Sequence, residues 1–331
     1  MTELPIIRLA LLAWISCLVS VRLYADQPGD EALPQGENKS SWKLNLRTKT
    51  IGGKQLWTDI RIQSGWRIQQ NTYTKHFRVL DSKNYRHAWG SRKQCDATFE
   101  RFLASGEIQP YRKRVIILLH GLARTRSSMD RMQKHLQGQI VASVLNMTYA
   151  STRDSLEQHA NALHSVLRHI PKTCEISFVC HSMGNIVVRR FLYAGQDPRI
   201  ARIVMLAPPN QGSALGTLFE DNQVFKTVWG TAGKQMTSAF TELQRLLAVP
   251  TCEFAIISGA MQNHLIQNRL LQGENDLVLT VKETRLSGAV DFRTLDSTHT
   301  RIMIQPKTLQ WTTRFLQRGY FETPQTTVPI K

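Results

Sequence analysis

A serine stands where the sequence changes from a strand-like to a helix-like pattern. The segment Val-Cys-His-Ser-Met-Gly at 179–184 follows Ile176-Ser177-Phe178 and precedes apolar residues at helical spacing. Such a turn lifts a serine hydroxyl clear of the sheet, where a histidine can accept its proton. The pattern departs from G-x-S-x-G because Cys180 replaces the first glycine. Ser182 is therefore a candidate nucleophile for acyl transfer, and the alternative is a serine that merely precedes a helix.

The base that would serve this nucleophile should follow a late strand. His299 comes after a strand expected near 290–295 and before the last predicted helix. Among the nine other histidines, His164 and His169 lie in the predicted helix ahead of the serine. His181 adjoins Ser182, but we expect the sharp turn to direct its side chain elsewhere. We therefore predict His299 as the general base.

The acid that orients the base should fall between the nucleophile and the base. Asp276 lies in a polar turn between the strands expected at 254–257 and 290–292. Its carboxylate would hold the imidazole in one tautomer and stabilise the imidazolium. The alternative is that Asp276 caps a short helix beginning at Leu277. Glu274 is the nearest substitute, and Asp291 and Asp296 are less suitably placed.

An oxyanion hole requires backbone N–H groups near the nucleophile. His120-Gly121-Leu122 follows the apolar run 115–119, and Gly121 lets the chain turn there. We predict that the N–H groups of Leu122 and Met183 form the hole, where losing one donor typically lowers the rate about 100- to 1,000-fold. The alternative is an ordinary turn at the end of a strand.

These residues need a scaffold of alternating strands and helices. From residue 115 onward the pattern repeats as βαβ units, which predicts a mostly parallel sheet with helices on both faces. Asp154 and Glu157 mark the expected start of one helix. An antiparallel hairpin around Ser64-Gly65 precedes these units, and an apolar helical insertion occupies about 209–250. The predicted strands are 58–62, 66–70, 115–119, 142–147, 176–179, 203–206, 254–257 and 290–292, and the predicted helices include 95–103, 128–137, 156–170 and 307–317.

The N-terminus differs in composition from the rest of the 331 residues. Arg8 precedes a short apolar stretch, so residues 1–25 are expected to form a signal peptide or an N-terminal anchor. Export to the periplasm or secretion is expected, with membrane anchoring as the alternative. Residues 26–41 are polar and read as a linker. The folded domain is expected over 42–320, followed by a tail at 321–331.

The formal charge of +17 is spread along the chain in short clusters. Nucleic-acid binding is not expected, because no aromatic-basic recognition motif accompanies the charge. Peripheral contact with an anionic membrane is an alternative to a role in solubility alone. The four cysteines that follow the N-terminal segment would permit disulfides in an exported protein, without indicating their pairing.

From about residue 115 to residue 317 the chain resembles the lipases and esterases of the α/β-hydrolase superfamily. Residues 115–122 resemble their oxyanion turn, 180–184 their nucleophile elbow, and 207–213 the Pro-x-x-Gly-Ser segment of lipase-like bacterial members and deacylases. The order of Ser182, Asp276 and His299 along the chain is also that of the triad residues in α/β-hydrolases. Family members usually have glycine where Cys180 and Leu277 stand.

The resemblance implies an α/β-hydrolase fold with a lid-like helical insertion and two-step hydrolysis of an ester or lipid substrate. The reaction requires no metal or organic cofactor. An acyltransferase or thioesterase would use the same triad, and a non-catalytic envelope-binding protein would retain the scaffold alone. The sequence does not separate these alternatives, nor does it indicate the oligomeric state.

Overall fold

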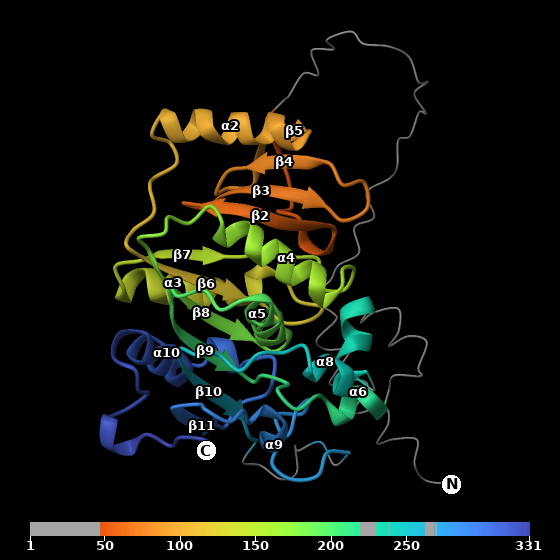
Figure 1. Ribbon diagram of the computed structural model, residues 1–331, viewed down its shortest axis with the longest axis vertical. Helices are drawn as coiled ribbons and strands as arrows, with labels where there is room; N and C mark the ends of the chain where they lie inside the picture. Colours follow the sequence, from red (N-terminus) through yellow and green to blue (C-terminus); the bar gives the residue numbers. More distant parts are fainter. Residues whose placement is uncertain (1–46, 219–229, 238, 262–267, 269) are drawn as a thin grey trace. The chain divides into compact units, whose positions relative to one another are not determined.

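A computed structural model describes residues 47–218, 230–237, 239–261, 268 and 270–331. This part of the chain contains a six-stranded parallel sheet and a five-stranded antiparallel sheet (Figure 1). Helices cover both faces of the parallel sheet. The predicted α/β-hydrolase architecture, with antiparallel strands before a mostly parallel sheet, is confirmed.

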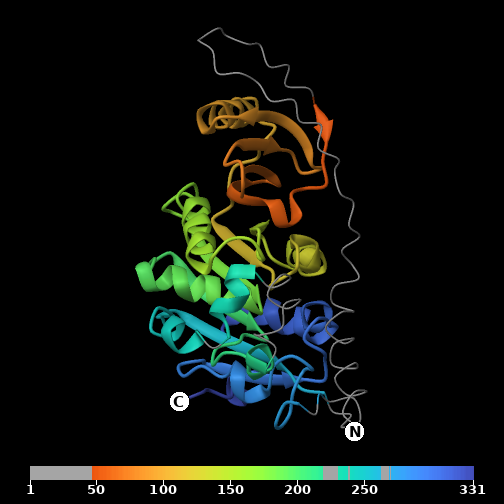
Figure 2. The ribbon, with the colours of Figure 1, turned by 90° about the vertical axis from the view of Figure 1, so that its right-hand side faces the viewer.

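The parallel sheet has the order β11-β10-β9-β8-β6-β7. Strand β6, which lies between β8 and β7, is a continuous apolar run from Val115 to Leu119, and its residues alternate between two cores. Ile117 packs with helices α4 and α5, whereas Ile116 packs with α3 and α10. Figure 2 shows these two helix pairs on opposite sides of the sheet. A strand buried on both faces has no polar side, which explains the pattern of β6. The strands are β6 (Arg114–Leu119), β7 (Ser143–Asn146), β8 (Glu175–His181), β9 (Ile200–Leu206), β10 (Glu253–Gly259) and β11 (Asp291–Leu295).

The helices begin and end close to the predicted positions. Helix α4 starts at residue 156 as predicted and ends three residues earlier than predicted. Its cap is Ser155, which pairs with Gln158, whereas Asp154 and Glu157 were expected to do so. The longer helices are α2 (Arg92–Ala104), α3 (Asp130–Gln139), α4 (Leu156–Leu167), α5 (Met183–Ala194) and α10 (Pro306–Arg318). The shorter ones are α6 (Ala214–Leu218), α8 (Phe240–Gln244), α9 (Val281–Thr284), η1 (Lys54–Leu56), η2 (Arg126–Met129), η3 (Ile302–Ile304) and η4 (Pro324–Thr326).

The antiparallel sheet extends the predicted hairpin to five strands in the order β1-β5-β4-β3-β2. Helix α2 covers one face through a small core that includes Phe99 and Ile68. The outer strand β2 meets the chain just beyond β7, where the Asp59 N–H donates to the Thr148 carbonyl at 2.8 Å. The Asp59 carboxylate accepts in return from the Thr148 N–H at 2.7 Å. The strands are β1 (Thr48–Lys49), β2 (Trp57–Gln63), β3 (Trp66–Asn71), β4 (Phe77–Leu80) and β5 (Tyr85–Gly90).

The chain after residue 320 packs onto the domain, although a tail was expected there. Phe321 is fully buried among residues of α10 and the parallel sheet. The Ile330 carbonyl accepts a hydrogen bond from the Gly288 N–H at 2.8 Å. The Asp291 carboxylate accepts from the N–H groups of Phe321 and Val328, each at 3.0 Å. The local sequence of residues 321–331 does not indicate these long-range contacts, so a tail was expected from composition alone.

The insertion expected at about 209–250 contains helical segments joined by turns in its described part. It contains α6, the helical residues 230–235 and α8. Three of its aromatic residues, which could line a pocket or a lid, fall outside the described residues, namely Phe219, Phe225 and Trp229. The expected signal segment 1–25 and linker 26–41 also fall outside them.

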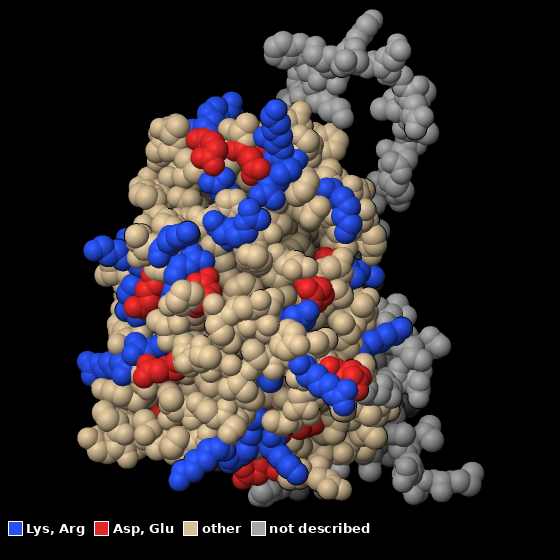
Figure 3. Space-filling view, viewed as in Figure 1, with Lys and Arg blue, Asp and Glu red and all other residues tan. Residues whose placement is uncertain are grey.

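Charge and cysteine placement bear on the expected partners. Figure 3 shows lysine and arginine in several separate places on one face, interleaved with acidic residues. Cys95, Cys174, Cys180 and Cys252 are all free, so none of them forms the disulfides that an exported chain would permit. None of the helices in the described ranges is long and apolar enough to cross a membrane.

Candidate active site

Ser182 occupies a strained turn between β8 and α5. Its backbone has φ 52° and ψ −123°, a left-handed conformation that L residues seldom adopt. The close approach of α5 to β6 depends on Gly184. A Cβ atom there would lie 2.8 Å from the Leu119 carbonyl oxygen and 2.9 Å from that of His120. The second glycine of the elbow is therefore required by space.

His299 and Asp276 complete a continuous hydrogen-bonded chain with this serine. His299 Nε2 lies 2.9 Å from Ser182 Oγ, and His299 Nδ1 lies 2.8 Å from Asp276 Oδ2. The Asp276 side chain is fully buried, and that of His299 is 9% exposed. The two residues are also joined through their backbones, since the His299 N–H donates to the Asp276 carbonyl at 2.9 Å.

The backbone of its own turn holds the Asp276 carboxylate. Its Oδ1 accepts hydrogen bonds from the N–H groups of Val278 at 3.0 Å and Leu279 at 2.7 Å. No helix begins at Leu277, so the alternative of a helix cap is wrong: α9 begins at Val281 and is capped by Thr280. One carboxylate oxygen is thus fixed by amides while the other faces His299.

The turn that contains Leu122 approaches Ser182 closely. A Cβ atom on Gly121 would lie 3.0 Å from Ser182 Cβ and 2.9 Å from His181 Nδ1. Met183 is the first residue of α5, where amides have no partner within the helix. The Tyr149 hydroxyl donates to the His120 carbonyl, and the two rings stack 4.1 Å apart. The structure therefore brings together the turn, the elbow and the triad residues that the sequence pointed to.

Comparisons with known proteins support the fold. No protein-family model and no curated protein matches the chain. Phospholipase PlaB from Legionella pneumophila has a TM-score of 0.50 and 16% identity, with 64% of this chain and 62% of that chain covered. This chain has the α/β-hydrolase fold. Mature lipase BlEst2 from Bacillus licheniformis has a TM-score of 0.47 and 17% identity, with 64% and 91% of the two chains covered. The chain thus spans less than two thirds of the PlaB chain.

Two positions depart from the usual glycines of the α/β-hydrolase motifs, and the structure shows how each side chain is accommodated. Cys180 is fully buried in the core beneath α4 and α5, where burial raises the pKa of its thiol well above the ordinary value. Leu277 has φ 79°, a conformation that favours glycine. Its strain is offset by the hydrogen bonds of the acid turn, including one from the Leu277 N–H to Asn275 Oδ1 at 3.1 Å.

His181 contacts the base, although the sequence suggested that its side chain would be directed elsewhere. Its Nε2 donates to the His299 carbonyl at 2.9 Å, and the two rings lie 4.9 Å apart. Burial, with the neighbouring His299 next in importance, lowers the pKa of His181 well below its usual value. Alternation along β8 gives the missed signal. His181 lies on the same face as Val179, which packs with α10, and His299 lies in the connection between β11 and that helix.

Because a second histidine, His159, is buried, we predict that the folding stability of the protein depends on pH. His159 packs edge-on against Tyr149, and burial lowers its pKa from 6.5 to about 3. The unfolded chain therefore binds this proton more readily, so stability is lost as pH falls below 6.5. When the pH falls from about 7.5 to about 5, the free energy of unfolding of the variant His159→Leu should rise by about 2 kcal/mol relative to that of the native chain. Urea unfolding at both pH values measures the difference.

The buried carboxyls with raised pKa values act in the opposite direction. Burial raises the pKa of Asp59 and of Asp154, and both groups are present in the variant as well as in the native chain. Their contributions cancel in the difference between the two proteins. Parallel stability curves for the two proteins would show that His159 is not held neutral.

The described residues contain no group of three or more His, Cys, Asp or Glu side chains that could hold a metal ion. The chemistry considered below uses the chain's own side chains and backbone amides.

Proposed function

We propose that this chain is a serine hydrolase that cleaves carboxylic esters through an acyl-enzyme. The observation that carries the proposal is the unbroken hydrogen-bonded sequence from Ser182 Oγ through the His299 ring to the buried Asp276 carboxylate. A serine hydroxyl needs such a base to become nucleophilic at neutral pH. The base in turn needs an acceptor that fixes its tautomer.

Ser182 Oγ attacks the ester carbonyl while His299 Nε2 accepts its proton. The N–H groups of Leu122 and Met183 hold the oxyanion of the tetrahedral intermediate. The imidazolium returns the proton to the leaving alcohol, and the acyl group stays on the serine. Water, deprotonated by the same histidine, then releases the acid and restores the enzyme.

We propose esters of acyl chains, including lipids, as the substrate class. The insertion has exposed apolar side chains at Leu218 and Leu246, which are compatible with binding of an apolar acyl chain. The structural neighbour with a TM-score of 0.50 is the phospholipase PlaB, which is compatible with this class. Export through the N-terminal segment and peripheral contact with an anionic membrane belong to the same proposal.

Fluorophosphonate labelling tests the nucleophile. Native protein should be labelled stoichiometrically, and the variant Ser182→Ala should lose the label, because the probe phosphonylates only an activated serine. Mass spectrometry of the labelled peptide measures this. The matched control is Ser165→Ala, which removes an exposed hydroxyl on α4 that donates to its own helix at Asn161 O. Equal labelling of native protein and Ser182→Ala would contradict the proposal.

Hydrolysis of esters of graded acyl length then tests the reaction. Release of free acid supports a hydrolase, whereas preferential transfer of the acyl group to an added alcohol would indicate an acyltransferase with the same triad. Specific labelling of Ser182 without turnover of any ester would contradict ester hydrolysis while leaving the nucleophile assignment intact.

A further inference from the structure

A polar cavity of about 550 Å³ lies between the two sheets. Strand β2 is the outer strand of the antiparallel sheet and β7 that of the parallel sheet. Near Asp59 and Thr148 the two edges are hydrogen-bonded, whereas the turn at Ser64 and the strand residue Ser143 face each other across the cavity. None of the triad residues lines it. This is a separate space from the candidate active site.

Positive charge predominates in the lining. Arg112, Arg126 and Lys134 stand against a single carboxylate, Asp130, which leaves an excess of two positive charges. None of the three cations has a carboxylate oxygen within 4.0 Å in the described part of the chain. Other arginines do: Arg92 pairs with Asp96, Arg199 with Asp197 and Arg202 with Glu253. The charges of the cavity are therefore available to a ligand.

Asp130 is already engaged by the protein. Its Oδ1 accepts a hydrogen bond from Asn146 Nδ2 at 3.0 Å. The same Asn146 amide donates to the Arg126 carbonyl at 2.9 Å. This contact ties the backbone of η2 and the first turn of α3 to β7, so the cation-bearing segments are held in place before any ligand binds.

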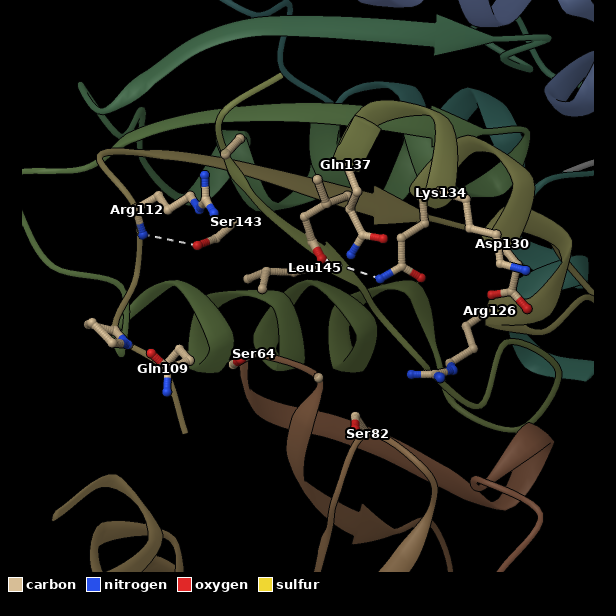
Figure 4. A pocket seen from close by; sticks show the side chains of 15 residues that line it. Ser64, Ser82, Gln109, Arg112, Arg126, Asp130, Lys134, Gln137, Ser143 and Leu145 are labelled. Carbon is tan, nitrogen blue, oxygen red and sulfur yellow. Dashed lines mark hydrogen bonds between the residues drawn. The ribbon is translucent and has the colours of Figure 1, made fainter. Parts of the chain in front are cut away.

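Hydrogen-bonding groups surround the cations. Figure 4 shows Arg112 and Ser143 at one end of the cavity, Arg126 at the other, and Ser64 and Ser82 on the side of the antiparallel sheet. Ser143 Oγ accepts from the Arg112 N–H at 3.0 Å, which leaves its hydroxyl proton for another acceptor. Glutamine side chains also line the cavity. A ligand rich in acceptor oxygens would find several partners at once.

A buried arginine adds to the positive potential near Arg126. Arg67 is fully buried in β3 and donates through Nη2 to Asn84 Oδ1. Its Nε and Nη1 have no hydrogen-bond partner among the described residues. Burial, offset in part by Asp59, and then the charge of Arg126 lower the pKa of Arg67 to about 10. Arg67 thus remains cationic at neutral pH.

We propose that this cavity is a second ligand site for a small polar molecule with a phosphate monoester group, which binds at the end where Arg126 and Lys134 lie, while Arg112 at the other end faces the rest of the molecule (Figure 4). Such a group carries a charge of about −1.5 to −2, which matches the excess of two positive charges. Guanidinium groups donate paired hydrogen bonds to phosphate oxygens. The cavity volume lies within the usual range of about 300–1,000 Å³ for small-molecule sites.

Calorimetric titration of the purified full chain tests the site. The probes are sn-glycerol 3-phosphate in solution, glycerol as its neutral counterpart, and phosphatidylcholine vesicles with or without phosphatidic acid. We expect saturable binding of the phosphate-bearing probe and none of glycerol. Arg126→Gln and the exposed Lys134→Gln should each weaken binding about tenfold, as expected for loss of one charge-assisted contact. Lys172→Gln, an exposed residue outside the cavity, removes the same charge and should leave the affinity unchanged.

The arms of the experiment separate the source of the phosphate. Binding of glycerol 3-phosphate that is sensitive to the variants indicates a soluble ligand, and variant-sensitive binding confined to phosphatidic acid vesicles indicates a lipid headgroup. Both outcomes support the site. Absence of saturable binding to either probe up to about 10 mM, or equal affinity of Lys134→Gln and Lys172→Gln, would overturn it. Because no step uses Ser182, the outcome is independent of the proposed hydrolysis.

Discussion

His299→Ala should lower kcat for a p-nitrophenyl ester by about 10⁶-fold, and Asp276→Asn by about 10⁴-fold, as in triads of this type. Without the imidazole, nothing accepts the Ser182 proton. With asparagine at 276, the imidazole loses the carboxylate that fixes its tautomer and stabilises its positive charge. Single-turnover kinetics with each variant measures both losses, and the difference between them separates proton transfer from orientation.

The matched control for the base is His164→Ala. His164 is exposed on α4 and takes no part in the hydrogen-bonded chain of the triad, so kcat should be unchanged. Far-UV circular dichroism of all three variants checks that the fold is retained. Full activity of a folded His299→Ala protein would show that another group accepts the serine proton.

The sequence was informative about the triad because each catalytic candidate follows a strand. Parallel strands end at the same edge of the sheet, so residues just beyond β8 and β11 must lie near one another. Choosing Asp276 over Glu274 needed more than this, since both lie in one turn. The choice depends on amides of Val278 and Leu279 that the backbone aims at the carboxylate. That geometry passes through Leu277 at φ 79°, which leucine propensity does not suggest.

Contacts between segments far apart in the sequence were beyond prediction from local patterns. The hairpin around Ser64 was predictable because its alternation and turn are local, but the short strands β1, β4 and β5 complete the sheet only through pairing. Phe321 becomes buried, and its N–H donates a hydrogen bond to Asp291, only once the parallel sheet has assembled. The cavity between the turns at Ser64 and Ser82 and strand β7 likewise exists only because two sheets meet edge to edge at one end.

Gly259→Ala should lower kcat about 100-fold and reduce the free energy of unfolding by roughly 1–3 kcal/mol. Gly259 ends β10 between the acid turn and the loop that carries the base. An added Cβ atom would lie 2.6 Å from Asp276 Cβ and 2.7 Å from the Ser297 carbonyl oxygen. These distances are too short for van der Waals contact, so the acid and the base loop must separate.

Gly138→Ala is the matched control for this effect. An added Cβ atom at Gly138, within α3, meets nothing within 4 Å. Alanine there should stabilise the protein by about 0.5–1 kcal/mol through helix propensity and leave kcat unchanged. Kinetics and urea unfolding of both variants distinguish crowding at the triad from a general effect of replacing glycine. If Gly259→Ala retained native kcat, the acid turn could relax without moving Asp276 away from His299, and the rigid support inferred for the triad would be wrong.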